Sequence, residues 1–199
     1  MTERLRVPGP RDVRATLDSP EATEVVVACP PHPQMGGDRR DSRLRAVSDA
    51  LADRSLACLR FDYGPWDEGR GEVTDCSAAL AWARDNFQQV GLFGYSFGGA
   101  VALRAAAGAC DEGTPPAAVS VLAPAGTLAG ESVAENVDAV TCPLQVVYGE
   151  RDDTVDSLPV VERARDHGGT VERVPADHFY AGQLDDVAET VGRFLGTSL

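Results

Sequence analysis

The sequence predicts an α/β fold, a mostly parallel sheet with helices on both faces, in a single domain of residues 1–199. Short β-like runs alternate with helical runs, which is the order from which a parallel sheet with crossover helices is built. A glycine-rich turn, Gly94-Tyr95-Ser96-Phe97-Gly98, joins one β-like run to a helical run. The chain has 199 residues, 43% of them hydrophobic, and can therefore bury a core of this kind.

The chain begins with an expected hairpin. Residues 4–7 and 13–17 flank a Pro-Gly-Pro turn and predict two antiparallel strands at the sheet edge. The continuous apolar run 24–28 is typical of a buried strand. Apolar residues then recur at helical spacing and predict a helix over residues 38–53.

The middle of the chain repeats this alternation. Residues 56–61 predict a strand, and residues 72–88 predict a helix with Val73, Cys76, Leu80 and Phe87 roughly on one face. The strand 90–93 runs into the glycine-rich turn, and an alanine-rich helix follows through Ala107.

The last third of the chain predicts three more strands and two more helices. The strands cover residues 117–122, 144–148 and 170–174. One helix covers residues 157–167 and ends before two glycines. The other covers residues 184–195, is amphipathic and closes the chain.

The segment Gly94-x-Ser96-x-Gly98 has the residue types of a sharp turn that presents a serine nucleophile. A serine with strained backbone angles on a tight turn needs very small neighbours, which glycine supplies. The following helix begins there, and its free N–H groups favour negative charge beside the serine. The alternative is a glycine-rich turn that only packs tightly. A dinucleotide site is excluded, because no G-x-G-x-x-G opens this helix.

The chain contains three histidines, His32, His167 and His178. A serine triad on such a sheet has its acid after a later strand and its histidine after the last one. His178 follows the last expected strand and is the predicted base. His167 closes the preceding helix before a glycine, where an imidazole caps carbonyl groups.

The acid is expected after the strand 144–148. Two adjacent aspartates, Asp152 and Asp153, lie there; we favour Asp152, with Asp153 in reserve and Glu150 behind it. The chain order Ser96, acid, His178 is that of the α/β-hydrolase fold. The histidine would take the serine proton, and the acid would hold the imidazole in the useful tautomer.

The loop after the first buried strand is expected to stabilise an oxyanion together with the turn. One main-chain N–H is that of Phe97, next to the serine, and a second comes from the loop. Gln34 is the predicted second donor and Met35 the alternative, whereas Pro33 has no N–H. We expect His32 to shape this loop rather than to titrate.

Several segments together resemble a family of small α/β hydrolases described as dienelactone-hydrolase-like. The similar segments are Pro31-His32-Pro33-Gln34-Met35-Gly36-Gly37, Leu59-Arg60-Phe61-Asp62-Tyr63, Gly69-Arg70-Gly71-Glu72, Gly94-Tyr95-Ser96-Phe97-Gly98-Gly99, Gly149-Glu150-Arg151-Asp152 and Ala176-Asp177-His178-Phe179. The resemblance implies an esterase-like hydrolase without a metal or organic cofactor. The chain departs from the family pattern where Gly64-Pro65-Trp66 replaces an Arg-Gly pair, and dienelactone hydrolases proper carry cysteine in place of Ser96.

Only residues 125–140 separate two of the expected strands, so no large cap domain is expected. We infer a shallow, open pocket that suits short acyl esters. Its walls are expected to include aromatic side chains, namely Trp66, Tyr95, Phe97 and Phe179.

The composition of the chain argues against some classes of binding partner. The net charge is −13, and all 18 basic residues are arginines, which argues against nucleic acid and anionic membranes. An acidic chain without lysine suggests a halophilic source. No apolar run has the length of a membrane span or of a signal peptide, so a cytoplasmic location is expected. Five scattered cysteines predict neither a zinc site nor disulfides.

Three functions are compatible with these features. The first is a serine hydrolase that cleaves small carboxylic esters through an acyl-serine intermediate. The second is the same triad acting on another acyl bond, as a thioesterase, peptidase or acyltransferase. The third is a non-catalytic binding protein with this fold. The sequence leaves the oligomeric state open.

Overall fold

A computed structural model describes all residues from Met1 to Leu199. Its main feature is one eight-stranded sheet in the order β1-β2-β4-β3-β5-β6-β9-β10. The strands are β1 (Thr2–Val7), β2 (Val13–Asp18), β3 (Glu24–Cys29), β4 (Ala57–Asp62), β5 (Gln89–Tyr95), β6 (Val119–Leu122), β9 (Leu144–Gly149) and β10 (Thr170–Val174).

The sheet is parallel from β4 to β10 and antiparallel only at its N-terminal edge. The strands β1 and β2 form the predicted hairpin, with Val7 opposite Val13, and β2 pairs antiparallel with β4. β3 is central, with β4 and β5 parallel on its two sides. Because the strands from β4 to β10 run in one direction, the loops after β3, β5, β9 and β10 all leave the same edge of the sheet.

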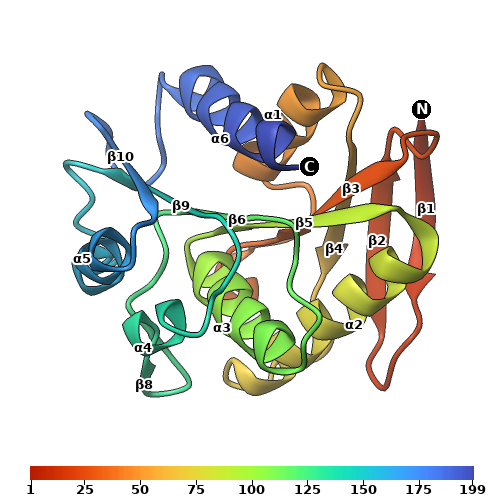
Figure 1. Ribbon diagram of the computed structural model, residues 1–199, viewed down its shortest axis with the longest axis horizontal. Helices are drawn as coiled ribbons and strands as arrows, with labels where there is room; N and C mark the ends of the chain where they lie inside the picture. Colours follow the sequence, from red (N-terminus) through yellow and green to blue (C-terminus); the bar gives the residue numbers. More distant parts are fainter.

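Helices cover both faces of the sheet, as predicted (Figure 1). The helices α1 and α6 lie side by side on one face, and α2, α3, α4 and α5 lie on the other. Their bounds are α1 (Ser42–Ala52), α2 (Arg70–Asn86), α3 (Phe97–Asp111), α4 (Ala134–Val137), α5 (Leu158–Asp166) and α6 (Leu184–Ser198).

The apolar run of β3 shows why these layers form. Side chains alternate between the two faces of a strand, so a strand buried on both faces is apolar throughout. Val25 and Val27 pack into the core with α2 and α3, while Val26 and Ala28 pack into the core with α1 and α6. All four side chains are fully buried.

The structure differs from the sequence prediction in three features. The helix predicted over residues 38–53 begins only at Ser42, and Asp41 caps it. The segment 125–140 contains a two-stranded ribbon, β7 (Thr127–Leu128) and β8 (Glu131–Ser132), and then α4, none of which its short polar pattern indicated. The buried face of α2 also includes two carboxylates, Glu72 and Asp75, whereas Val73 is only partly buried. A helical pattern cannot show that an acidic residue meets partners from distant segments.

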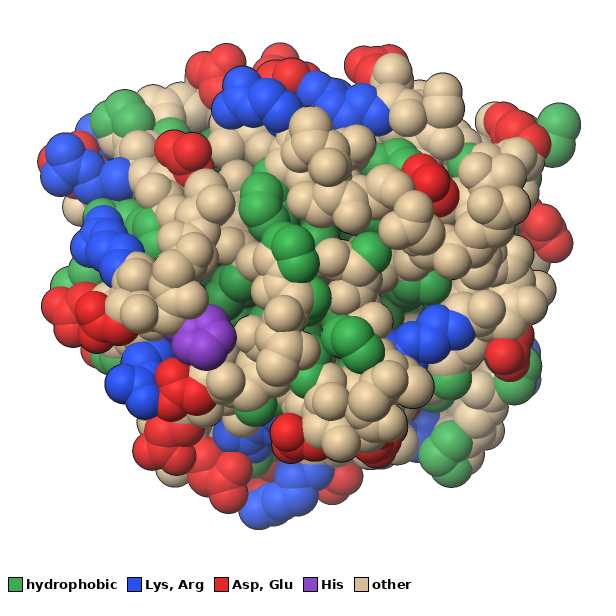
Figure 2. All heavy atoms as spheres, viewed as in Figure 1, with side chains coloured by type: hydrophobic (Ala, Val, Ile, Leu, Met, Phe, Trp, Pro, Cys, Tyr) green, Lys and Arg blue, Asp and Glu red, His purple; other side chains and the backbone are tan.

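Charged side chains of both signs share the surface. Figure 2 shows arginines interspersed with Asp and Glu around the margin of one face, with hydrophobic side chains nearer its centre. No helix combines the length and the apolar character that crossing a membrane requires.

Two glycines of the β5–α3 turn are required by close backbone contacts. A Cβ on Gly98 would lie 2.3 Å from the carbonyl oxygen of Cys29 and 2.4 Å from that of Pro30. A Cβ on Gly94 would lie 2.2 Å from the carbonyl oxygen of Gly98. The start of α3 therefore touches the end of β3, and only glycine permits this approach.

We predict that Gly98→Ala destabilises the protein by more than about 3 kcal/mol, because the new methyl group must displace backbone rather than a flexible side chain. The matched control is Gly108→Ala in the same helix, where nothing lies within 4 Å of the added carbon. That change is expected to stabilise by about 0.5–1 kcal/mol. Urea unfolding of both variants checks the pair, and equal stabilities would contradict the packing argument.

Candidate active site

Ser96 lies between the last residue of β5 and the first residue of α3. Its φ of 58° and ψ of −120° place a non-glycine residue in a strained region of backbone space. The turn is held by main-chain bonds: the Ser96 N–H donates to the carbonyl of Leu122 at 2.8 Å, and the Ser96 carbonyl accepts from Ala125 at 3.1 Å. The hydroxyl is thus fixed at the edge of the sheet where the loops gather.

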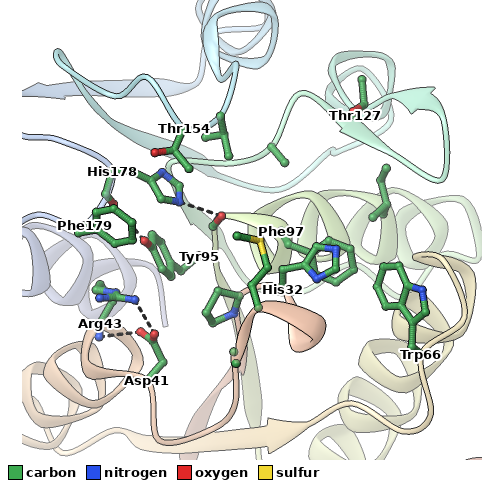
Figure 3. A pocket seen from close by; sticks show the side chains of 18 of the residues that line it. His32, Asp41, Arg43, Trp66, Tyr95, Phe97, Thr127, Thr154, His178 and Phe179 are labelled. Carbon is green, nitrogen blue, oxygen red and sulfur yellow. Dashed lines mark hydrogen bonds and ion pairs between the residues drawn. The ribbon is translucent and has the colours of Figure 1, made fainter.

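His178 reaches this hydroxyl from the loop after β10. Its Nε2 lies 3.0 Å from Oγ of Ser96, the contact drawn as a dashed line from His178 in Figure 3. Its Nδ1 lies 2.7 Å from Oδ2 of Asp152. The side chains of His178 and Asp152 are 6% and 4% exposed, so water screens this pair weakly. With Nδ1–H donating to the carboxylate, Nε2 carries the lone pair that faces the serine.

The structure places Asp152, rather than its acidic neighbours, against His178. The second carboxylate oxygen of Asp152 accepts from the N–H groups of Thr154 and Val155 at 2.9 and 3.2 Å, which fixes its direction. Asp153 is exposed, and Glu150 points to Arg173, with 3.5 Å between the charged atoms.

The main-chain donors of the loop after β3 differ from the prediction. A 3-10 turn (Pro33–Met35) bends this loop back on itself. The Gln34 N–H, the predicted oxyanion donor, instead donates to Nδ1 of His32 at 3.3 Å. The alternative donor, the Met35 N–H, donates to the carbonyl of His32 at 3.0 Å.

The main-chain N–H groups of His32 and Phe97 are both without an acceptor. The His32 N–H has no acceptor within the protein, and the Phe97 N–H lies in the first turn of α3, where a helix offers no internal acceptor. The sequence did not indicate the His32 N–H, because it cannot show which amides of a loop are left without an acceptor.

The ring of Tyr95 lies under His178. The Tyr95 hydroxyl donates to the main-chain carbonyl of His178 at 3.0 Å, and the two ring centroids are 5.3 Å apart. The guanidinium of Arg43 lies over the Tyr95 ring, 4.7 Å from its centroid, and pairs with Asp41 at 2.6 Å. Burial raises the pKa of Tyr95, so its hydroxyl stays protonated and donates.

The sequence holds only a partial signal for this arrangement. Asp41 lies inside the helix predicted over residues 38–53, whereas in the structure it caps α1 by accepting the N–H of Arg43 at 2.9 Å; aspartate is a residue type that favours this role. The stacking of Arg43 on Tyr95 depends on packing between α1 and β5 and has no local signature.

A cavity of about 750 Å³ opens over Ser96 and His178. This volume lies in the range of small-molecule sites. The four aromatic residues expected in its walls, Trp66, Tyr95, Phe97 and Phe179, all line it. Leu128 of the β7–β8 ribbon also lines the cavity, so the short segment 125–140 supplies part of the wall.

The remaining sequence candidates lie away from this cavity. His167 ends α5, and its Nε2 lies 3.3 Å from the carbonyl of Val140, consistent with a structural role. All five cysteines are free, and the two closest, Cys29 and Cys76, are buried with their sulfurs 3.3 Å apart. No group of three or more His, Cys, Asp or Glu side chains is arranged to hold a metal ion.

Comparison with known proteins identifies the fold. No protein-family model matches the chain. Uncharacterized protein RP471 of Rickettsia prowazekii is 31% identical over 100 residues, which span 45% of this chain and 42% of that protein.

Solved structures are similar over nearly the whole chain. An alpha-beta serine hydrolase homologue from Coxiella burnetii is 26% identical, with a TM-score of 0.81 over 97% of each chain. XC6422 from Xanthomonas campestris, an α/β serine hydrolase without lid, is 23% identical, with a TM-score of 0.84 over 100% of this chain and 95% of that one. Est1E from Butyrivibrio proteoclasticus is 20% identical, with a TM-score of 0.80 over 98% of each chain. The chain has the α/β-hydrolase fold without a lid domain.

We predict that Tyr95→Phe lowers kcat on an ester substrate by about 10- to 100-fold, because the loop that carries His178 loses its anchor. The buried carbonyl of His178 also loses its donor, at a cost of about 1–3 kcal/mol in stability. The control is Tyr180→Phe, since the buried Tyr180 hydroxyl has no acceptor. That variant should keep its melting temperature and kcat. Equal kcat values for the two variants would contradict this role of Tyr95.

Proposed function

We propose that this protein is a serine hydrolase that cleaves carboxylic esters through an acyl-serine intermediate. The observation that carries the proposal is the continuous contact from Ser96 Oγ to His178 Nε2 at 3.0 Å and from His178 Nδ1 to Asp152 Oδ2 at 2.7 Å. A nucleophile, a base within hydrogen-bond reach and a group that orients the base are the parts that acyl transfer requires.

In the first half of the proposed reaction, His178 Nε2 accepts the Ser96 proton while Oγ attacks the ester carbonyl carbon. Asp152 stabilises the imidazolium that forms and stays ionised itself. The tetrahedral intermediate collapses when its C–O bond to the alcohol breaks, and the imidazolium gives its proton to the departing alcohol. The acyl group remains on Ser96.

In the second half, His178 accepts a proton from water, whose oxygen attacks the acyl carbon. The bond to Ser96 Oγ breaks, and the proton returns to the serine. The products are a carboxylic acid and the free enzyme, so the cycle needs no cofactor or metal.

The free N–H groups of His32 and Phe97 are our proposed oxyanion donors, in place of the Gln34 amide that the sequence analysis favoured. Gln34 and Met35 already donate within their own turn, and a donor that is in use stabilises no further charge. Backbone donors suit this task because they are oriented before charge develops. The close contact of Gly98 with the carbonyls of Cys29 and Pro30 keeps the two donor segments together.

Esters are favoured over other acyl compounds by the solved structures of similar fold. Est1E has been solved with ferulic acid bound, and a Pyrococcus furiosus protein with a TM-score of 0.81 is named an esterase. The dienelactone-hydrolase-like motifs agree with a small-ester substrate. The intact triad geometry argues against a purely non-catalytic role.

The acidic surface suggests the setting in which the enzyme works. With 31 acidic and 18 basic residues, surface carboxylates repel one another, and salt screens this repulsion. We propose a salt-rich cytoplasm as its location.

Replacement of Ser96 and of the acidic pair tests the mechanism. Ser96→Ala should lose both fluorophosphonate labelling and turnover of p-nitrophenyl acetate. Asp152→Asn should lower kcat by about 10³- to 10⁴-fold, because His178 would adopt the wrong tautomer.

The matched control is Asp153→Asn, which removes one exposed carboxylate beside Asp152 and should keep kcat within about twofold, because surface changes away from a site have small effects. A fully active Ser96→Ala protein, or equal losses for the two Asn variants, would overturn the proposed triad.

The salt proposal predicts a melting temperature that rises from low salt to molar KCl, because screening relieves repulsion among the excess carboxylates. Calorimetry in KCl measures this rise. A melting temperature that does not change with KCl would refute the proposed salt-rich setting.

A further inference from the structure

Exposed hydrophobic side chains gather at the mouth of the cavity. The protein has five large hydrophobic side chains that are well exposed, Met1, Met35, Trp66, Leu158 and Phe179. Three of them, Met35, Trp66 and Phe179, line the cavity over Ser96. Apolar surface left in water beside a cavity is typical of a ligand-binding site.

On one side of Ser96, three rings form a continuous aromatic surface, which we call the aromatic wall: His32, Trp66 and Phe97. The ring centroid of His32 lies 4.7 Å from that of Trp66 and 4.8 Å from that of Phe97. Figure 3 shows the wall on one side of the cavity and His178 and Phe179 on the other. A substrate held at Ser96 therefore has the wall beside it.

The loop that carries Trp66 is fixed from beneath by two buried carboxylates of α2. Glu72, with no exposed surface, accepts the N–H groups of Asp67 and Gly69 at 3.0 and 2.8 Å. Asp75, 1% exposed, accepts the N–H of Gly64 at 2.9 Å. Both ends of the loop that carries an exposed tryptophan are thus tied to the protein interior.

Arg11 completes this support. Its Nε lies 2.7 Å from Asp75, and its guanidinium also donates to the carbonyl of Pro65, next to Trp66. The loop includes Glu68, a non-glycine residue with a φ of 54°. Burying carboxylates and straining the backbone both cost free energy. The hydrogen bonds and the ion pair that these groups make fix the loop, and they hold Trp66 in a defined position.

The charges around the cavity disfavour an anionic substrate. Asp41 and Glu68 line it, and its one arginine, Arg43, is already paired with Asp41 at 2.6 Å. Burial lowers the pKa of His32, so the wall is uncharged at neutral pH. The protein as a whole carries a net charge of −13.

We propose that the substrates are uncharged esters bearing an aryl group that packs on the aromatic wall, with Trp66 as the specificity-determining residue. This inference rests on the esterase function proposed above. A planar aromatic group packs favourably on offset or tilted rings, beyond the gain from burying an aliphatic group of the same size. The fixed loop adds to this preference, because little motion of Trp66 is lost on binding.

The test compares aryl esters, whose ring is planar, with cyclohexyl esters of similar size, whose ring is puckered. One pair varies the acyl side: ethyl 3-phenylpropionate and ethyl 3-cyclohexylpropionate. The other pair varies the alcohol side: benzyl acetate and cyclohexylmethyl acetate. The rate of acid release gives kcat/KM for each ester. Each value is then divided by the rate constant for alkaline hydrolysis of the same ester. We expect the aryl member to be favoured by about two- to tenfold on at least one side.

Two variants assign the preference to Trp66. Trp66→Leu should bring the aryl-to-cyclohexyl ratio close to one, while Trp66→Phe should keep most of the ratio. Leu158→Ala, a change at an exposed residue outside the aromatic wall, should leave the ratio unchanged. Melting temperatures of all variants show that each is folded.

The outcomes separate this inference from the function on which it rests. Hydrolysis of all four esters with ratios near one would overturn the aryl preference and leave the esterase function standing. A ratio that survives Trp66→Leu would overturn the role of Trp66. A wild-type protein that neither hydrolyses any of the esters nor labels with a fluorophosphonate would end the proposed function, and this inference with it.

Discussion

The contact between Gly98 and the end of β3 is the constraint on which the site depends. Because the carbonyls of Cys29 and Pro30 lie where a side chain would be, α3 begins directly against the loop that holds His32. Ser96, with a φ of 58°, lies in the turn at the start of this helix. The parallel sheet then delivers Asp152 and His178 to the same edge, since the loops after β9 and β10 leave the sheet there.

Two polar assemblies hold the two sides of the serine. On the histidine side, Asp41 orients Arg43, which lies over Tyr95, and Tyr95 holds the backbone of His178. On the other side, Glu72 and Asp75 hold the Trp66 loop. The Asp41–Arg43 pair is partly buried, and Glu72 and Asp75 are buried. Each assembly thus uses charged groups shielded from water to fix a loop, and these groups lie outside the residues proposed to react.

Local patterns in the sequence were sufficient for the order along the chain of the strands in the main sheet, the hairpin at its edge, the serine turn and the loops that carry Asp152 and His178. They were insufficient where the shape of a single turn determines which side chain or amide faces the site. Adjacent residues point in different directions, so Asp152 and Asp153 are distinguished only by the turn after β9. The Gln34 amide is occupied because a 3-10 turn closes onto the His32 ring. The burial of Asp75 depends on Arg11, 64 residues earlier in the chain.

The two outer strands of the sheet have a consequence for how the protein behaves among its own copies. β1 and β10 each leave one row of main-chain groups unpaired, and such rows invite a further strand from another molecule. Both strands carry charged side chains, as in Glu3-Arg4 and Glu172-Arg173. Charged side chains on an edge strand disfavour pairing with another copy, because such pairing would remove water from them.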